Sequence, residues 1–352
     1  MHKLIQLLGR LLFWSAIVGI VVMALSQLLG RYFWQFELFT HYVPHLAVLI
    51  LLAVAIFPDK HFLFTNSKPS SRILLRIILA AIGISLAIWS LQPFSIILNA
   101  FTPNIRLDSN ITTPTTIAYQ NVNINNLATD ETLQQLVNPA SHSGSFPDVV
   151  ALVEAGGLNW NDRLNKLAKQ YPTHCGINEN SPFAMQVFTN INASCDIIML
   201  SGFPVARLKT SSTTSTGLIS TVSSQASPDS LDKQKILYVA HPPPPLGRNL
   251  AILRNQYFAQ LAKLIKSDQH HSVMVIGDFN LSAFSPVYRD FMSQSKGTNN
   301  YLRRTTLTGL PTWRPFGIGI DHVLVNSNEE AVNTKAIDWQ GSDHRGFIIK
   351  WQ

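Results

Sequence analysis

The 352-residue sequence is poor in charge, because Asp, Glu, Lys and Arg together make up only 13% of it. Its mean hydropathy is +0.14, which is too apolar for a chain that is a soluble enzyme throughout. The sequence also has no internal repeat. A chain of this length is too long for one small domain and fits a membrane anchor followed by one large α/β domain.

Long stretches without Asp, Glu, Lys or Arg lie in the first third of the chain, at residues 11–30, 38–58 and 77–105. A helix needs roughly 20 apolar residues to cross the hydrocarbon core of a membrane. We therefore expect three transmembrane helices, near residues 11–30, 40–57 and 75–98. Alternatives remain: the first stretch fits a cleaved signal peptide, and the second, with His41, Pro44 and His45 near its start, fits a buried soluble helix.

Basic residues in the short flanks predict the orientation of these helices. The N-terminus carries Lys3 and Arg10, whereas the first loop has only Arg31, which Glu37 offsets. The second loop is basic again, with Lys60, Lys68, Arg72 and Arg76. With the N-terminus inside, three spans place the rest of the chain outside the cytoplasm of a plasma or inner membrane.

The net charge of +7 is unevenly distributed. Residues 1–106 carry eight Lys and Arg against two Asp and Glu, whereas residues 107–352 carry 19 against 18. The basic excess therefore belongs to membrane topology. A protein that holds duplex DNA needs clustered basic residues, so the charge does not favour nucleic acid as a partner.

Cysteine is scarce too. Cys175 and Cys195 are the only two, and both lie in the part expected outside the cytoplasm. An oxidising compartment permits a disulfide between them, but two isolated thiols in a core fit the sequence equally well.

After the anchor, expected at residues 1–98, the polar residues 99–113 predict a linker and residues 114–352 a second domain. Short apolar runs there alternate with amphipathic stretches. Strands are expected at residues 116–125, 148–154, 195–201, 216–224, 235–241, 272–280, 320–326 and 346–352. Helices are expected at residues 131–140, 159–171 and 249–267.

Four acidic residues stand at or beside the ends of predicted strands: Glu154, Asp278, Asp321 and Asp343. Taken singly, each fits a solvated strand end. Their neighbours make them more informative, because Asp278 lies in G-D-F-N, Asp321 in I-D-H-V-L and Asp343 in G-S-D-H-R. Asn121 follows Y-Q, and His241 precedes four prolines.

Phosphoester hydrolysis requires this set of groups. Magnesium takes oxygen ligands and needs only one or two carboxylates beside a phosphate. Another carboxylate must orient or deprotonate the attacking water, and a donor must meet the charge that grows on the phosphate. A histidine paired with an aspartate has a defined tautomer. The parts are supplied by Asn121, Glu154, His241, Asp278, Asn280, Asp321 and His344.

The order N-V, L-x-E, G-D-F-N, I-D-H and S-D-H resembles the endonuclease/exonuclease/phosphatase superfamily of DNase I-like proteins, over about residues 114–352. The anchor resembles a membrane-bound bacterial subgroup that includes proteins linked to glycopeptide resistance. The resemblance implies a four-layer α/β sandwich, two mixed β-sheets flanked by helices, behind three transmembrane helices.

The resemblance also implies a role for each matching residue. Asn121 and Glu154 match metal-site residues, and Asp343 matches an Asp that lies near the metal, which would be Mg²⁺ or Mn²⁺. Asp278 matches the Asp that activates the water, and Asn280 the Asn that contacts the phosphate. Asp321 matches the partner of the catalytic His344. His241 matches a His that stabilises the phosphate or the leaving group, although it also fits a structural His at a strand end.

The sequence departs from the superfamily pattern at two places. Val153 replaces a frequent Gln in L-Q-E, and Gly202 replaces a frequent Arg in S-R-F-P. Arg248 and Arg345 are left as potential phosphate contacts, although ordinary surface arginines fit both positions better.

We therefore expect a divalent-metal-dependent phosphoester hydrolase, acting outside the cytoplasm on a lipid-linked or small phosphate. A membrane-anchored nuclease is the alternative, and it would need a basic groove formed by folding. A non-catalytic membrane protein has no reason to keep Glu154, Asp278 and His344 together. If the expectation is right, the Glu154 carboxyl and the His344 ring lie within ~15 Å of each other, because one metal and one phosphate span less than that.

Overall fold

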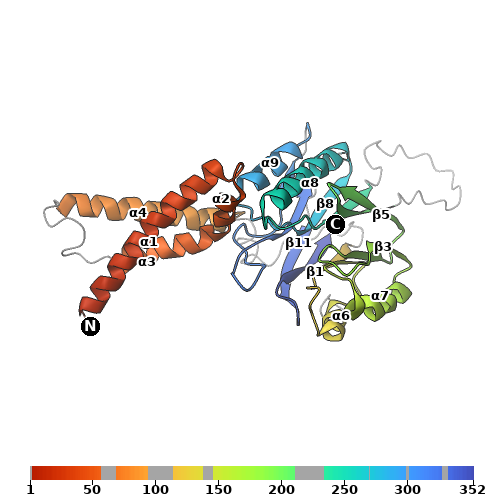
Figure 1. Cartoon of the computed structure of the whole chain (residues 1–352). Coiled ribbons are helices and arrows are strands. Elements are labelled where there is room, and N and C mark those ends of the chain that lie inside the picture. The colour runs from red at the N-terminus through yellow and green to blue at the C-terminus, as the bar shows by residue number, and fades with distance from the viewer. Residues whose placement is uncertain are drawn as a thin grey trace, which may run out of the picture.

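The computed structural model describes residues 2–56, 69–93, 114–137, 146–210, 234–268, 270–298, 301–326 and 332–352. A bundle of helices before residue 94 projects from a larger body of strands and helices after residue 113, with the N-terminus at the far end of the bundle (Figure 1). The expected linker, residues 99–113, lies outside the described residues.

The bundle consists of α1 (His2–Leu29), α2 (Trp34–Phe39), the short 3-10 helix η1 (Thr40–Tyr42), α3 (Val43–Ile56) and α4 (Pro69–Ser90). Three stretches are long and apolar enough to cross a membrane: Leu7–Leu29, Trp34–Ile56 and Ile73–Ser90. The three apolar helices that the sequence predicts are thus present in the structure.

The boundaries of two spans differ from the sequence prediction. The second begins at Trp34 and not near residue 40, because α2 and η1 lead into α3. The third helix ends at Ser90 and not near residue 98. Pro93 follows closely, and proline restricts the backbone of the residue before it, so helices commonly end ahead of it.

One sheet has the strand order β11-β12-β1-β2-β4-β3. Its strands are β1 (Thr115–Asn121), β2 (Val149–Val153), β3 (Thr173–Ile177), β4 (Met185–Thr189), β11 (Val332–Asp338) and β12 (Arg345–Trp351). β1 and β2 are parallel, whereas β1 and β12 are antiparallel.

The other sheet has the order β5-β6-β7-β8-β10-β9. Its strands are β5 (Ala193–Leu200), β6 (Phe203–Thr210), β7 (Lys235–Ala240), β8 (Ser272–Asp278), β9 (Leu302–Arg304) and β10 (Asp321–Asn326). β7 and β8 are parallel, and β10 runs antiparallel to β8 with Asp321 opposite Asp278.

The two sheets pack face to face. Side chains of alternate residues, such as Ile117 and Tyr119 of β1 and Met274 and Ile276 of β8, form a buried core between them. Helices α6 (Thr129–Val137) and α7 (Leu158–Gln170) cover the outer face of the first sheet. Helices α8 (Arg248–Ser267) and α9 (Pro286–Gln294) cover the second. The expected four-layer α/β sandwich is confirmed.

The sequence analysis overlooked several elements, and its predicted strand at residues 216–224 lies outside the described residues. The strands that it missed include β3, whose residues alternate between half-buried and exposed, β4, which is buried throughout, and β6, whose residues are buried or half-buried. Cys175 on β3 and Cys195 on β5 form a disulfide between the two sheets, which resolves a pairing that the sequence left open.

A buried ion pair holds the bundle against the sandwich. Glu37 of α2 pairs with Arg254 of α8, and both side chains are almost inaccessible to solvent, at 1% and 0% exposure. The second carboxylate oxygen of Glu37 accepts a hydrogen bond of 2.7 Å from Ser285 Oγ, which also caps α9. Ser285 therefore satisfies the acid while it starts the neighbouring helix.

Further contacts surround this ion pair. Phe284 is buried in the bundle core, where its ring packs edge-on against Trp89 at 4.8 Å. At the end of α4, Thr308 and Gly309 donate backbone hydrogen bonds to Gln92 O and Ser90 O, at 2.6 and 2.8 Å. The bundle is thus packed directly onto the sandwich.

We predict that Glu37→Gln strongly destabilises the full chain, because it leaves the buried guanidinium of Arg254 without a counter-charge. Breaking a buried pair in this way costs ~3–5 kcal/mol. Asp290→Asn is the matched control, since it removes the acid of the exposed pair with Arg31, and exposed pairs contribute little. Thermal unfolding in detergent measures both. Equal midpoints for the two variants would contradict a stabilising role for the buried pair.

Candidate active site

The expected site residues converge at one edge of the sandwich because of the strand directions. The C-terminal ends of the parallel strands β1 and β2 meet the N-terminal end of β12 in one sheet, and the ends of β7 and β8 meet the start of β10 in the other. Each of these six ends carries one polar residue, namely Asn121, Glu154, His344, His241, Asp278 and Asp321.

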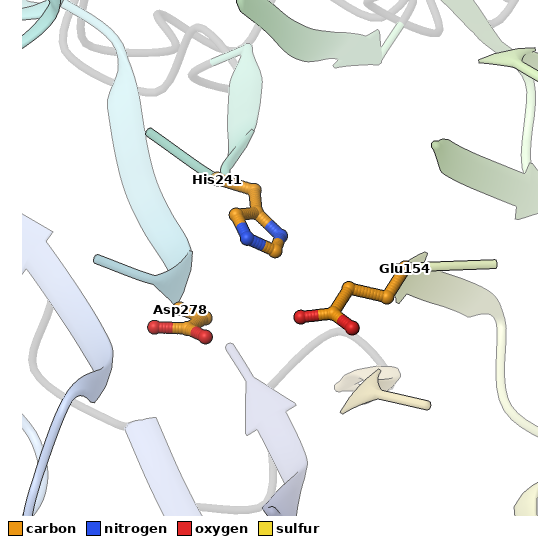
Figure 2. Close-up of side chains that lie close together, drawn as sticks. All are labelled: Glu154, His241 and Asp278. Carbon is orange, nitrogen blue, oxygen red and sulfur yellow. The ribbon is translucent and has the colours of Figure 1, made fainter. Parts of the chain in front are cut away.

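Glu154, His241 and Asp278 form the first cluster, in which one potential ligand atom from each lies within 4.8 Å of the others. Figure 2 shows the Glu154 and Asp278 carboxylates pointing toward each other, with the His241 ring beside them. Glu154 adopts a left-handed backbone conformation at φ 58°, which is uncommon for a residue other than glycine.

Asn121 links the two carboxylates of this cluster. Its Nδ2 donates to Glu154 Oε1 at 2.9 Å and to Asp278 Oδ2 at 3.1 Å. Its Oδ1 accepts from the backbone N–H of Asn123 at 3.0 Å. The amide nitrogen thus faces both acids, and a half-turn of the amide would present its oxygen, which is the atom that binds cations.

His344 and Asp321 form the second part of the site. His344 Nδ1 donates to Asp321 Oδ2 at 2.9 Å, and Tyr119 OH donates to Asp321 Oδ1 at 3.0 Å. The other ring nitrogen of His344, Nε2, lies 3.8 Å from Asp278 Oδ2. Asp321 therefore fixes the ring so that Nε2 faces the first cluster, and His344 and Glu154 lie well within one phosphate-sized site.

Asn280 and Asp343 flank these clusters. The Asn280 backbone N–H donates to Asp278 Oδ1 at 2.8 Å, and its side chain donates to the Pro242 carbonyl at 3.1 Å. Asp343 accepts hydrogen bonds from Asn123 Nδ2 at 2.8 Å and Trp313 Nε1 at 2.9 Å. Asp343 is in neither three-residue cluster of potential ligands within the described residues, so it borders the site.

Burial and charge shift the titration of these groups. Burial, together with the Asp321 carboxylate, raises the pKa of Asp278 to about 6. Burial also raises the pKa of Glu154 and lowers that of His241. Burial opposes charge on His344 as well, but the Asp321 and Asp278 carboxylates outweigh it and raise the pKa of the ring to about 10.

The donor set fits a divalent metal ion. Two carboxylates and an amide oxygen are ligands that Mg²⁺ and Mn²⁺ prefer. His241 Nδ1 is buried without a hydrogen-bond partner, and buried polar atoms normally have one. The first cluster is therefore suited to hold a cation, with His241 beside it.

The sequence analysis missed three residues of the site. Tyr119 lies on β1 two residues before Asn121, so the alternation of the strand places it on the same face. Trp313 and Asn123 lie in loops, and the loop conformation that brings both to Asp343 leaves no regular pattern in the sequence.

The structure also places the two residues that depart from the superfamily pattern, and the two arginines that are potential phosphate contacts. Val153 packs in the core between the sheets, and Gly202 lies in the β5–β6 turn with φ 86°. Arg345 is paired with Asp338 at 2.9 Å, and both side chains are partly exposed. Arg248 begins α8.

The family model described as Endonuclease/Exonuclease/phosphatase family matches residues 119–344, a stretch that contains every expected site residue. The chain belongs to this family. Endonucleases, exonucleases and phosphatases all cleave phosphoesters, so the chain is a phosphoester hydrolase.

Solved structures are similar in fold. SmcL superposes with a TM-score of 0.50 at 14% identity, covering 68% of this chain and 99% of that one. Sphingomyelinase C from Streptomyces griseocarneus gives 0.47 at 12%, covering 68% and 100%. A beta toxin mutant from Staphylococcus aureus with bound magnesium ions gives 0.44 at 12%, with the same coverage. No curated protein matches the sequence.

Proposed function

We propose that the chain is a Mg²⁺- or Mn²⁺-dependent phosphatase or phosphodiesterase that acts outside the cytoplasm on a lipid-linked or small phosphate. The observation that carries the proposal is the convergence of Glu154, Asp278 and the Asp321–His344 pair at one edge of the sandwich. Residues 1–98 would be the membrane anchor, 99–113 a linker and 114–352 the catalytic domain.

Glu154 and Asn121 would hold the metal ion, with Asp343 near it and Asp278 beside it. A bound ion would offset the negative charge of the phosphate and of the leaving oxygen. The hydrogen bonds from Trp313 and Asn123 would hold the Asp343 charge near the ion without adding a third carboxylate to the first cluster.

The remaining site residues have separate roles in proton transfer and in stabilising the phosphate. Asp278 accepts a proton from water as the water oxygen bonds to phosphorus and the bond to the leaving oxygen breaks. The His344 ring, held charged by Asp321, stabilises the phosphate through Nε2–H, and Asn280 donates a side-chain hydrogen bond to it. His241 stabilises the phosphate or the leaving oxygen.

A lipid-linked or small phosphate suits the charge of the molecule. The part after residue 106 carries 19 basic and 18 acidic residues, which is not the basic excess that duplex DNA requires. The three apolar helices support a substrate at a membrane, because they would hold the site at the bilayer surface.

We predict that Asp278→Asn lowers turnover ~10²–10⁴-fold, because it removes the group that accepts the proton. Asp321→Asn and His344→Ala should each be nearly as damaging, yet the double variant should be scarcely worse than either. The two residues act as one unit, and such effects are not additive. The assay is hydrolysis of p-nitrophenyl phosphate and bis-p-nitrophenyl phosphate by the full chain, with plasmid DNA as a third substrate.

Asp290→Asn is a control outside the site, in the exposed pair with Arg31, and it should leave turnover unchanged. Full activity in Asp278→Asn would exclude the proposed role of this carboxylate. If the double variant lost activity by the product of the two single losses, Asp321 and His344 would act independently and not as one unit. Cleavage of DNA alone would favour the nuclease.

The proposed location outside the cytoplasm rests on the basic flanks and on the Cys175–Cys195 disulfide, which forms in oxidising compartments. We predict that alkaline phosphatase fused after Gln352 is active and that a green fluorescent protein fused there is dark, since the former requires export and the latter fails in an oxidising export route. The reverse pair of results would place the domain in the cytoplasm.

A further inference from the structure

A groove between α1 and α3 lies in the part of the bundle that is nearest to the sandwich. It has a volume of about 360 Å³. Its deeper walls are apolar and include Gly19, Val22 and Met23 of α1 and Leu46 and Leu49 of α3. Both helices belong to stretches apolar enough to cross a membrane, so the groove would open to the hydrocarbon of the bilayer.

The end of the groove that is nearest to the sandwich is more polar. Tyr42 and His45 line it, both are exposed, and their rings pack edge to face at 5.5 Å. Tyrosine is common where a membrane protein leaves the hydrocarbon for the headgroup region. The groove thus has an apolar body and a polar mouth, which is the shape of a site for an amphiphile.

The polar mouth touches a loop of the catalytic site. His45 Nε2 lies 3.4 Å from the position that a Cβ would take on Gly317. In the same loop, the Trp313 ring lies 4.9 Å from Phe316 and 6.4 Å from the His344 ring, centre to centre. Trp313 also donates its hydrogen bond to Asp343. One five-residue loop, residues 313–317, therefore spans the space between the groove and the catalytic histidine.

We propose that the groove between α1 and α3 binds the hydrocarbon chain of a phosphate-bearing lipid whose headgroup reaches the catalytic site past residues 313–317. This inference rests on the proposed function, because the headgroup must be one that the site can hydrolyse. The occupant is a lipid and not a peptide helix, because the groove would open to hydrocarbon and its polar end lies against residues 313–317, which contact the proposed phosphate site.

A direct test uses the full chain in phosphatidylcholine nanodiscs and a polyprenyl phosphate with a photoreactive group on its chain. The same chain ending in an alcohol is the headgroup control. Cross-linked peptides are mapped by mass spectrometry. We expect the phosphate probe to label the groove walls around Val22 and Leu49 several-fold more than the alcohol probe does.

Val22→Phe and Leu49→Trp would fill the groove from opposite walls. Each should reduce the labelling about tenfold, which is the discrimination that a small change in the size of a hydrophobic pocket produces. The matched control is Val21→Phe, which adds the same ring on the adjacent, lipid-facing position, 53% exposed. The phosphate probe should label this variant to the same extent as the wild type. All three should hydrolyse bis-p-nitrophenyl phosphate at the wild-type rate, which also shows that they are folded.

Equal labelling by the two probes, or labelling that persists in both Val22→Phe and Leu49→Trp, would overturn the inference. The proposed function fails in a different way, through a wild-type chain that hydrolyses neither nitrophenyl ester in the presence of Mg²⁺ or Mn²⁺. Labelling is measured without turnover, so the two failures are distinguishable.

Discussion

The site brings acidic side chains together where there is little water. Asp278 and Asp321 face each other across β8 and β10, both at 2% exposure or less, and Asn121 ties Asp278 to Glu154. Two like charges ~4 Å apart repel by about 4 kcal/mol at an effective dielectric constant of 20. Such a cluster is tolerated only if positive charge balances it. The His344 ring provides one such charge within the fold, and a divalent cation at Glu154 and Asp278 would provide the other. The same need for positive charge makes the site suited to a phosphate.

The segment from Asp278 to Ser285 connects this charge cluster to the helical bundle. It begins with the site residues Asp278 and Asn280 and ends with Phe284 and Ser285, which contact the bundle core and Glu37. Within it, the Leu281 carbonyl accepts a 2.6 Å hydrogen bond from His322, the residue after Asp321. The candidate site and the bundle therefore share one short and largely buried stretch of chain. An anchor attached in this way would hold the site at a fixed height and angle above a bilayer, and not merely nearby.

Much of this arrangement could be predicted from the sequence, because strand ends and apolar runs leave local patterns. Asp278 follows an apolar run and Asp321 opens one, which indicates that both lie at strand ends, and the uncharged stretches predict the three apolar helices. Contacts between distant segments left no such pattern. Arg254 lies in an amphipathic helix and looks like a surface residue, yet it is buried against Glu37, 217 residues away. Trp313 reaches Asp343 only through a loop conformation. Hydrophobicity continues beyond Ser90 and predicts a longer third helix, whereas the helix ends ahead of Pro93.

Phosphoester hydrolysis by this chain should depend on a divalent cation held by Glu154 beside Asp278. The most direct measurement is the hydrolysis of bis-p-nitrophenyl phosphate by the full chain and by Glu154→Gln, stripped with EDTA and then titrated with Mn²⁺. We expect EDTA to abolish turnover and Mn²⁺ to restore it. Glu154→Gln should recover part of its activity only at higher Mn²⁺, because a ligand has been weakened and no proton-transfer group has been lost. Turnover of the wild type that EDTA leaves undiminished would contradict a metal-dependent reaction.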